Sequence, residues 1–304
     1  MNVKPSFAGV VTEVITPFRE NGVLDEGLLR EETEFQVKCG IHGLFTNGLA
    51  SECLSMSVEE KENVTRIVCS QVQGRIPVMA NITGNHFEEC RSLLEASEDA
   101  GADAVALTQP LVYSCTQDGI YRFFSDLIRE ARVPVCIYNA PQTCNTLTPS
   151  TVARLLNEHG NVSYYKESTI DVVHMQNTMR LINHDKAYEF LAGSDASILP
   201  VYSLGGKGVI SLISAVFPEI VLQLWKEIEE GNASAAREIQ EKILVIRETL
   251  KTGPFMAGYK YACELAGIPA GCVRSPLTGL SDGEKDKIRN GLLKLNLIES
   301  GGNV

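Results

Sequence analysis

The 304-residue sequence predicts an α/β fold, a (β/α)8 TIM barrel with a C-terminal helical extension. Short apolar runs recur at intervals of roughly 20 to 35 residues, each bounded by Gly, Pro, Asn or Asp, as buried parallel strands do. Stretches with helical periodicity lie between these runs. No Gly-rich phosphate loop follows the first run, although an open doubly wound sheet usually has one there. About eight repeated βα units close naturally into a barrel.

The apolar runs define the expected strands, and the periodic stretches between them define the expected helices. We expect strands at residues 9–15, 43–46, 77–82, 104–108, 134–139, 163–167, 189–192 and 208–212. We expect helices at residues 26–38, 57–73, 87–100, 117–131, 149–159 and 171–182. Ser57 with Glu60 three residues later, and Thr148 with Pro149 after it, are typical helix N-terminal signals.

The C-terminal part of the sequence holds more helix than a barrel needs. Residues 218–231, 233–251, 254–265 and 282–295 are all helix-like, whereas one closing helix would suffice. No Pro- or Ser-rich linker or charge run divides the chain before about residue 225. We therefore expect a barrel over residues 1–225 and an extension over residues 226–304. The extension is expected to pack on the barrel or on a neighbouring subunit, without a function of its own.

Composition excludes several classes of partner. The chain has 27 Lys and Arg against 38 Asp and Glu, a net charge of −11, which repels nucleic acid and anionic membrane surfaces. No segment approaches the roughly 18 apolar residues that span a bilayer. The nine cysteines form no C-x-x-C pair and are expected to be reduced thiols in a cytoplasmic protein.

Two residues at expected strand ends suggest amine chemistry, because barrel enzymes place catalytic groups at the C-terminal ends of strands. Lys166 lies in a run that should be buried, where an ammonium is costly, and a lowered pKa would relieve that cost and make the amine nucleophilic. The alternative is an exposed lysine paired with Glu167. Tyr138 ends the neighbouring strand, roughly 4.8 Å away, where its phenol could donate and recover a proton.

Other kinds of site have weaker support. The turn from Gly48 to Glu52 offers backbone N–H groups that could hold a carboxylate, although an ordinary βα turn explains it equally well. The five histidines show no paired spacing for a metal, and no G-x-S-x-G motif indicates a serine hydrolase. We therefore expect no metal and no cofactor.

Several ordered motifs together resemble the dihydrodipicolinate synthase / N-acetylneuraminate lyase family of pyruvate-dependent class I aldolases, from about residue 9 to residue 297. The motifs are Ile15-Thr16-Pro17-Phe18, Gly48-x-x-x-Glu52, Tyr138-Asn139-x-Pro141, Lys166-Glu167-Ser168, Ala192-Gly193-Ser194-Asp195 and Gly205-Gly206-x-Gly208-Val209-Ile210-Ser211. The resemblance implies that Lys166 is the Schiff-base lysine and Tyr138 the proton-shuttling tyrosine. It also places Gly193 and Ile210 beside the bound 2-oxo acid.

The turn after the second strand departs from the family pattern, which usually reads Gly-Thr-Thr-Gly-Glu or Gly-Ser-Thr-Gly-Glu. Leu49 and Ala50 replace the two hydroxyl residues, and Ser51 replaces the second glycine. Backbone amides of Gly48, Leu49, Ala50 and Ser51 could still hold the substrate carboxylate. A hydroxyl hydrogen bond could come from Ser51 alone.

Three further departures bear on the substrate. Thr143 stands where dihydrodipicolinate synthases carry an arginine for the semialdehyde carboxylate, and Ala196 stands where sialate lyases carry a glutamate. Tyr113 is the nearest match to the tyrosine that a neighbouring subunit normally lends. These departures favour a 2-keto-3-deoxy sugar acid over the substrates of either named enzyme.

The sequence thus predicts a Schiff-base aldolase or lyase that acts on pyruvate or a 2-keto-3-deoxy sugar acid, a small anionic substrate. The alternatives are dihydrodipicolinate synthase, N-acetylneuraminate lyase, and a non-catalytic homologue that binds 2-oxo acids. The resemblance also implies a homotetramer built as a dimer of dimers.

Overall fold

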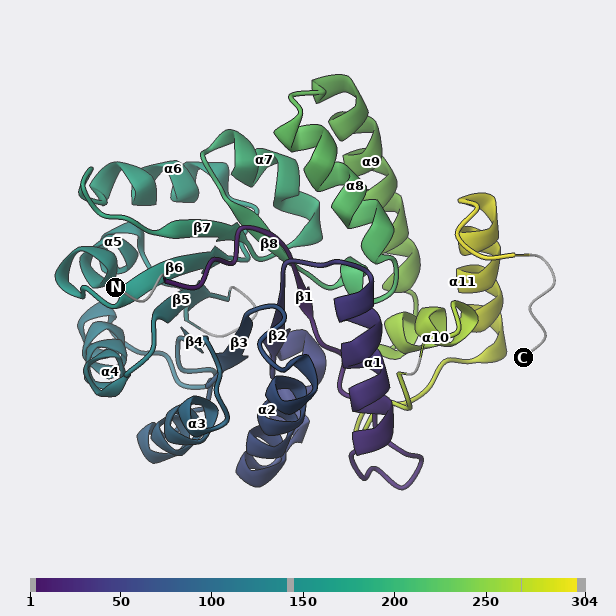
Figure 1. Ribbon diagram of the computed structural model, residues 1–304, viewed down its shortest axis with the longest axis horizontal. Coiled ribbons are helices and arrows are strands. Elements are labelled where there is room, and N and C mark those ends of the chain that lie inside the picture. Colours follow the sequence, from purple (N-terminus) through teal and green to yellow (C-terminus); the bar gives the residue numbers. More distant parts are fainter. Residues whose placement is uncertain (1–3, 141–144, 269, 300–304) are drawn as a thin grey trace.

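A closed barrel of eight parallel strands forms the centre of the molecule in the computed structural model, which describes residues 4–140, 145–268 and 270–299 (Figure 1). The strands are β1 (Gly9–Glu13), β2 (Gly43–Thr46), β3 (Val78–Asn81), β4 (Ala104–Thr108), β5 (Val135–Asn139), β6 (Val162–Glu167), β7 (Glu189–Ala192) and β8 (Gly208–Ser211). Each strand pairs with the next, and β8 pairs with β1 to close the barrel. The predicted fold class is confirmed.

A ring of helices surrounds the barrel. They are α1 (Glu26–Lys38), α2 (Val58–Val72), α3 (Phe87–Asp99), α4 (Gln117–Glu130), α5 (Pro149–Glu158), α6 (Val172–Leu181), α7 (Ile198–Ser203) and α8 (Pro218–Glu229). Both predicted N-terminal signals are confirmed: Ser57 and Glu60 form a capping box, and the Thr148 side chain accepts a hydrogen bond from the Thr151 N–H. Helix α7 was not predicted, because six residues are too few to show a helical period.

Three helices follow the barrel: α9 (Ala233–Leu250), α10 (Ala257–Leu265) and α11 (Asp282–Lys294). In Figure 1, α9 lies along α8, while α10 and α11 stand on the side of the molecule away from α4 and α5. The Gln240 amide donates a hydrogen bond of 2.8 Å to the Asp195 carbonyl, which ties α9 to the end of β7. Because α8 contains residue 225, we propose that the division between barrel and extension falls after Glu229.

The barrel interior is a packed apolar core. Side chains from all eight strands fill it, and they include Val11, Phe45, Met79, Ala106, Cys136, Tyr138, Tyr164, Leu191 and Ile210. Along β6 the side chains alternate, since Tyr164 belongs to this interior cluster and Tyr165 belongs to the layer between barrel and helices. The same alternation directs Lys166 inward and Glu167 outward.

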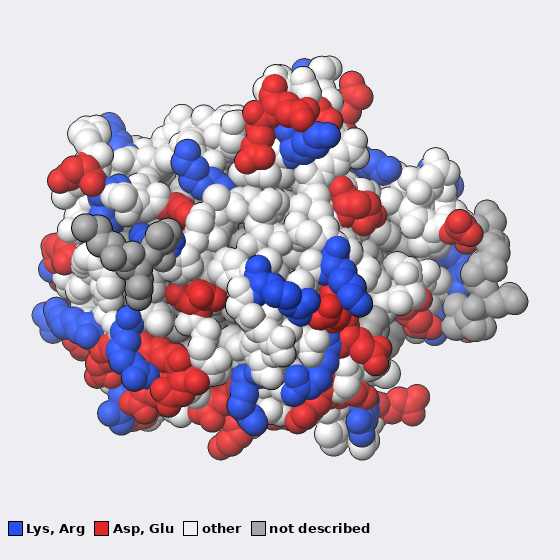
Figure 2. Space-filling view, viewed as in Figure 1, with Lys and Arg blue, Asp and Glu red and all other residues white. Residues whose placement is uncertain are grey.

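The surface carries charges of both signs. Figure 2 shows acidic and basic side chains interspersed over the face that is seen in Figure 1. None of the helices in the described part of the chain combines the length and the apolar character that crossing a membrane requires.

Candidate active site

Lys166 lies at the C-terminal end of β6 and is 1% exposed, within the barrel mouth. Its Nζ stands 3.9 Å from the centroid of the Tyr138 ring and 4.3 Å from that of the Phe45 ring. Tyr138 is opposite Lys166 in the β5–β6 register, so the structure brings together the two residues that the sequence singled out. The two ring faces favour a positive charge on the nitrogen, both as an ammonium and as an iminium.

A buried carboxylate, Glu13 at the end of β1, faces the same amine. Its Oε2 lies 3.6 Å from the Lys166 Nζ, and the residue is 5% exposed. Burial lowers the pKa of Lys166, but Tyr138 and Glu13 raise it by more, so the pKa lies above its ordinary value. The expected lowered pKa is therefore wrong for the resting site, because the sequence argument did not include a carboxylate here. A positively charged Lys166 must lose a proton before it can attack a carbonyl.

Glu167 has partners on the outer face of the barrel. Its carboxylate accepts hydrogen bonds from the Asn139 amide at 2.9 Å and from the Thr169 N–H at 2.7 Å, and the Tyr165 hydroxyl also donates to it. Burial alone raises the pKa of Glu167, but hydrogen bonds from His174, Asn139 and Tyr165 hold it below its ordinary value. The alternative in which an exposed Lys166 pairs with Glu167 is wrong, because the two side chains leave β6 on opposite faces.

Burial raises the pKa of the Tyr138 phenol, whereas the nearby Lys166 ammonium acts in the opposite direction. The Glu13 carboxylate adds to the upward shift. Tyr138 is 2% exposed, and its ring meets the edge of Phe45 at a centroid distance of 6.2 Å. A neutral phenol held in this way can donate a proton and then recover it.

The turn after β2 begins at Gly48 and continues as one 3-10 turn, Leu49–Ser51. The Ala50 N–H donates a hydrogen bond of 2.9 Å to the Glu13 Oε1, so a protein carboxylate already occupies the amide that was expected to hold the substrate. A Cβ on Gly48 would lie 2.1 Å from the same Oε1, which only glycine avoids. The Ser51 hydroxyl donates to the Val14 carbonyl at 2.5 Å and is therefore turned away from a ligand.

The end of this turn is anchored by Glu52, which has a left-handed backbone with φ of 59°. Its Oε1 forms an ion pair of 2.7 Å with the Lys260 Nζ on α10. The Arg274 N–H donates to its other oxygen at 2.9 Å. The turn is thus fixed to α10 and to the segment that follows it.

The ends of β7 and β8 supply the opposite wall. A Cβ on Gly193 would lie 2.2 Å from the Ser168 Oγ and 2.9 Å from the Glu167 carbonyl oxygen, so glycine lets the end of β7 pass close to the end of β6. The Asp195 carboxylate accepts hydrogen bonds from the Ser211 hydroxyl and from the Leu212 N–H at 3.1 Å, while burial raises its pKa. Ile210 is 2% exposed and lies across the mouth from β5.

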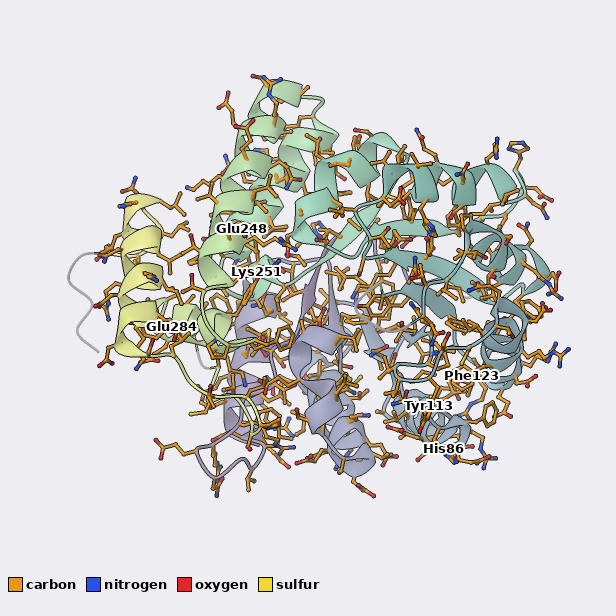
Figure 3. The ribbon with its side chains drawn as sticks, turned by 180° about the vertical axis from the view of Figure 1, so that it is seen from behind. His86, Tyr113, Phe123, Glu248, Lys251 and Glu284 are labelled. Carbon is orange, nitrogen blue, oxygen red and sulfur yellow. The ribbon has the colours of Figure 1, made fainter. Side chains whose placement is uncertain are left out.

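A cavity of about 420 Å³ opens above these residues. Its walls are formed by Glu13, Ala50, Tyr138, Ser168, Gly193, Ser194, Asp195, Ile210, Leu212, Arg247, Lys251 and Tyr259. The two basic residues come from α9 and its C-terminal end, where Figure 3 labels Lys251. The extension therefore contributes residues to the wall of this cavity.

Two expected contacts stay predictions, Tyr113 with a neighbouring subunit and Thr143 with the substrate. Tyr113 is 79% exposed, and Figure 3 shows it well apart from Lys251, on the other side of the molecule. Thr143 falls outside the described residues.

Sequence reasoning missed Glu13, Arg247 and Lys251. Glu13 carried the same signal that identified Lys166, an ionisable residue inside a buried strand. The two basic residues gave no such signal, because charged residues are ordinary on an exposed helix.

Comparison with known proteins places these residues in a family. A sequence profile described as the dihydrodipicolinate synthetase family matches residues 6–295. The 4-hydroxy-tetrahydrodipicolinate synthase of Methanopyrus kandleri is 32% identical over 297 residues, covering 97% of this chain and 98% of the relative. The enzyme of the same name from Methanocaldococcus jannaschii is 33% identical and covers 96% of this chain and 100% of the relative.

Solved structures agree with the sequence comparison. Dihydrodipicolinate synthase from Aquifex aeolicus superposes with a TM-score of 0.91 at 31% identity, covering 97% of this chain and 100% of that one. A prophage protein of the dihydrodipicolinic acid synthase family from Escherichia coli, solved in complex with pyruvate, has a TM-score of 0.90 at 26% identity. That match covers 96% of this chain and 99% of the prophage protein.

Proposed function

Because the chain belongs to the dihydrodipicolinate synthetase family, we propose that Lys166 forms a Schiff base with a small 2-oxo acid. The chain is accordingly an enzyme, a carbon–carbon lyase of the class I aldolase type. The observation that carries the assignment to Lys166 is its position, buried beside the Tyr138 ring beneath a cavity. The pyruvate complex of the related prophage protein supports a 2-oxo acid as the first substrate.

The proposed reaction uses only side chains of this site. The Lys166 amine attacks the ketone carbon, the carbonyl oxygen leaves as water, and a protonated imine remains. The imine withdraws electrons while the C3–C4 bond of the substrate breaks or forms. Tyr138 transfers protons to and from the oxygen of the aldehyde as this bond breaks or forms.

The aldehyde partner is the open part of the proposal. We favour a 2-keto-3-deoxy sugar acid, which would be cleaved to pyruvate and an aldehyde. The first rival is condensation of pyruvate with aspartate semialdehyde, the reaction of dihydrodipicolinate synthase. It gains support from Arg247 and Lys251, because these two residues offer positive charge to a second carboxylate on the cavity wall. N-acetylneuraminate cleavage and binding without turnover are the remaining alternatives.

Borohydride trapping tests the central assignment. Reduction in the presence of pyruvate should add one fixed mass to the peptide that contains Lys166, measured by mass spectrometry. Lys166→Arg keeps the positive charge and should give no adduct. An adduct on another lysine, or none with any 2-oxo acid, would overturn the assignment.

A substrate panel separates the rivals. Purified enzyme would be assayed with pyruvate plus aspartate semialdehyde, with 2-keto-3-deoxy acids, and with N-acetylneuraminate. Turnover of one group identifies the reaction. Trapping of pyruvate without turnover of any group would identify a 2-oxo acid binder.

We also propose a homotetramer in the cytoplasm. The cysteines among the described residues are all free thiols, which suits a reducing compartment. Val112 and Tyr113 are 65% and 79% exposed, as expected of side chains that a neighbouring subunit covers. Light scattering coupled to size-exclusion chromatography would test the tetramer, and Tyr113→Lys should weaken it.

A further inference from the structure

The Glu13 carboxylate bridges the two groups that a bound 2-oxo acid would use. One oxygen accepts the Ala50 N–H at 2.9 Å, and the other lies 3.6 Å from the Lys166 Nζ. The side chain also packs directly over Gly48, where it would collide with any Cβ. Glu13 therefore fills the concave side of the turn after β2.

Bond geometry allows the substrate's carboxylate to take this same place. In an imine of a 2-oxo acid, bonds of about 1.3 and 1.5 Å separate the nitrogen from the carboxylate carbon, so the carboxylate oxygens lie roughly 2.7 to 3.6 Å from that nitrogen. The Glu13 Oε2 stands at the upper end of this range from the Lys166 Nζ. Among the described residues, Glu13 thus meets both the amine and the amide that the substrate's own carboxylate would approach.

We propose that Glu13 is an internal competitor for the substrate's carboxylate and the first acceptor of the Lys166 proton. The inference rests on the proposed Schiff-base function. Two carboxylates that share one buried site repel each other, and this repulsion favours transfer of a nearby proton to one of them. Entry of a 2-oxo acid therefore drives the proton of the Lys166 ammonium onto Glu13. The neutral carboxyl then releases the Ala50 amide to the substrate.

The proton balance closes over imine formation. The ammonium gives one proton to the Glu13 carboxylate, and the neutral amine adds to the ketone carbon. A second proton moves from nitrogen to oxygen in the resulting carbinolamine. When the C–O bond breaks, Glu13 returns its proton to the departing hydroxyl, which leaves as water. Glu13 ends as a carboxylate turned into the cavity that it lines, away from the substrate's carboxylate, and the iminium keeps the positive charge. No other reactant is required.

Variants at Glu13 test both parts of the proposal. Glu13→Ala empties the turn, and Glu13→Gln keeps the shape and the hydrogen-bond acceptor without the charge. The Kd for pyruvate should fall about tenfold or more in Glu13→Ala, the effect of removing one competing charged hydrogen bond, and by less in Glu13→Gln. The rate of imine formation at saturating pyruvate should fall about 100-fold or more in both, as for loss of a proton acceptor.

Glu189→Gln is the matched control. Glu189 is also a carboxylate of a barrel strand, but it lies at the opposite end of the barrel, where it accepts hydrogen bonds from Ser6 and the Phe7 N–H. Its substitution should leave both quantities unchanged. Thermal unfolding of all three variants shows whether they fold, and the near-isosteric Glu13→Gln keeps the test valid if Glu13→Ala unfolds.

The outcomes separate this inference from the proposed function. Pyruvate Kd values that do not fall at Glu13→Ala overturn the competitor role, and an unchanged rate of imine formation overturns the proton transfer. If either result is found while pyruvate is still trapped on Lys166, the proposed Schiff-base function stands. Absence of an adduct in the wild type and in both Glu13 variants would instead refute the function itself. An adduct that forms in Glu13→Ala but not in the wild type would overturn the proton-transfer role, because loss of the proton acceptor should slow imine formation.

Discussion

Glu32 on α1 should make the stability of the protein depend on pH. The side chain is 1% exposed, and its Oε1 accepts the Ile15 N–H at 3.1 Å. Its Oε2 has no hydrogen-bond partner among the described residues. Burial raises the pKa of Glu32 to about 8, although the Ile15 hydrogen bond and the positive charge of Lys260 act in the opposite direction. Glu32→Gln removes the ionisable group with little change of shape.

The size of the effect follows from the shift. The pKa rises from 4.5 to about 8, so 8 − 4.5 gives about 3.5 units. At about 1.36 kcal/mol per unit this amounts to ~5 kcal/mol. Between pH 4.5 and about 8, Glu32 is protonated in the folded protein but ionised in the unfolded chain. The folded state therefore keeps this part of its stability in full below pH 4.5, where Glu32 is protonated in both states. It loses it as the pH rises from 4.5 through about 8.

Urea unfolding followed by circular dichroism would measure this dependence. From about pH 5 to pH 8, the free energy of unfolding of the wild type should fall by about 4 kcal/mol relative to that of Glu32→Gln. Glu31→Gln, on the exposed face of the same helix, should show no comparable gain. A difference between wild type and Glu32→Gln that stays constant with pH would refute the reasoning.

Three further predictions concern the cavity. Gly193→Ala should destabilise the protein by about 1–3 kcal/mol in thermal unfolding. Gly160→Ala is the control, because a Cβ there meets nothing within 4 Å, and equal melting temperatures of the two variants would contradict the steric argument. Tyr138→Phe should lower kcat by about 10²- to 10⁴-fold while the pyruvate adduct still forms, and a wild-type kcat would exclude the phenol as proton carrier. Replacing Arg247 and Lys251 by glutamine should raise KM for an anionic second substrate about tenfold or more, while the rate of imine formation stays unchanged. A KM equal to that of the wild type would show that these two residues do not bind the second substrate.

The fold was predictable because its signal repeats. Buried parallel strands are uniformly apolar and their helices are amphipathic, so each βα unit gives the same pattern, and eight units agree with one another. Most predicted boundaries lie within one or two residues of those observed. The start of α10 is an exception, since the helix begins at Ala257 after a left-handed Met256 rather than at Pro254. That conformation depends on tertiary packing, which a local pattern does not report.

The site was predictable only in part, for a related reason. Lys166 and Tyr138 stand on adjacent strands, so strand order alone brings them together. Glu13 lies far away in sequence, and its contact with Lys166 depends on closure of the barrel across its mouth. Arg247 and Lys251 reach the cavity because of where α9 packs, which no residue pattern in the sequence specifies.

The anchoring of the turn after β2 determines which part of the site can move when a carboxylate enters. Glu52 is tied to Lys260, and the Ser51 hydroxyl is tied to the Val14 carbonyl at the end of β1. Moving the turn would break a buried ion pair, which is costly when one charge is left without its partner. Turning the Glu13 side chain breaks the Ala50 hydrogen bond and the contact with Lys166, but the proposed proton transfer first makes both groups of that contact neutral. The side chain then turns into a cavity that it already lines. Ligand entry should therefore displace the glutamate and leave the backbone amides of the turn in place.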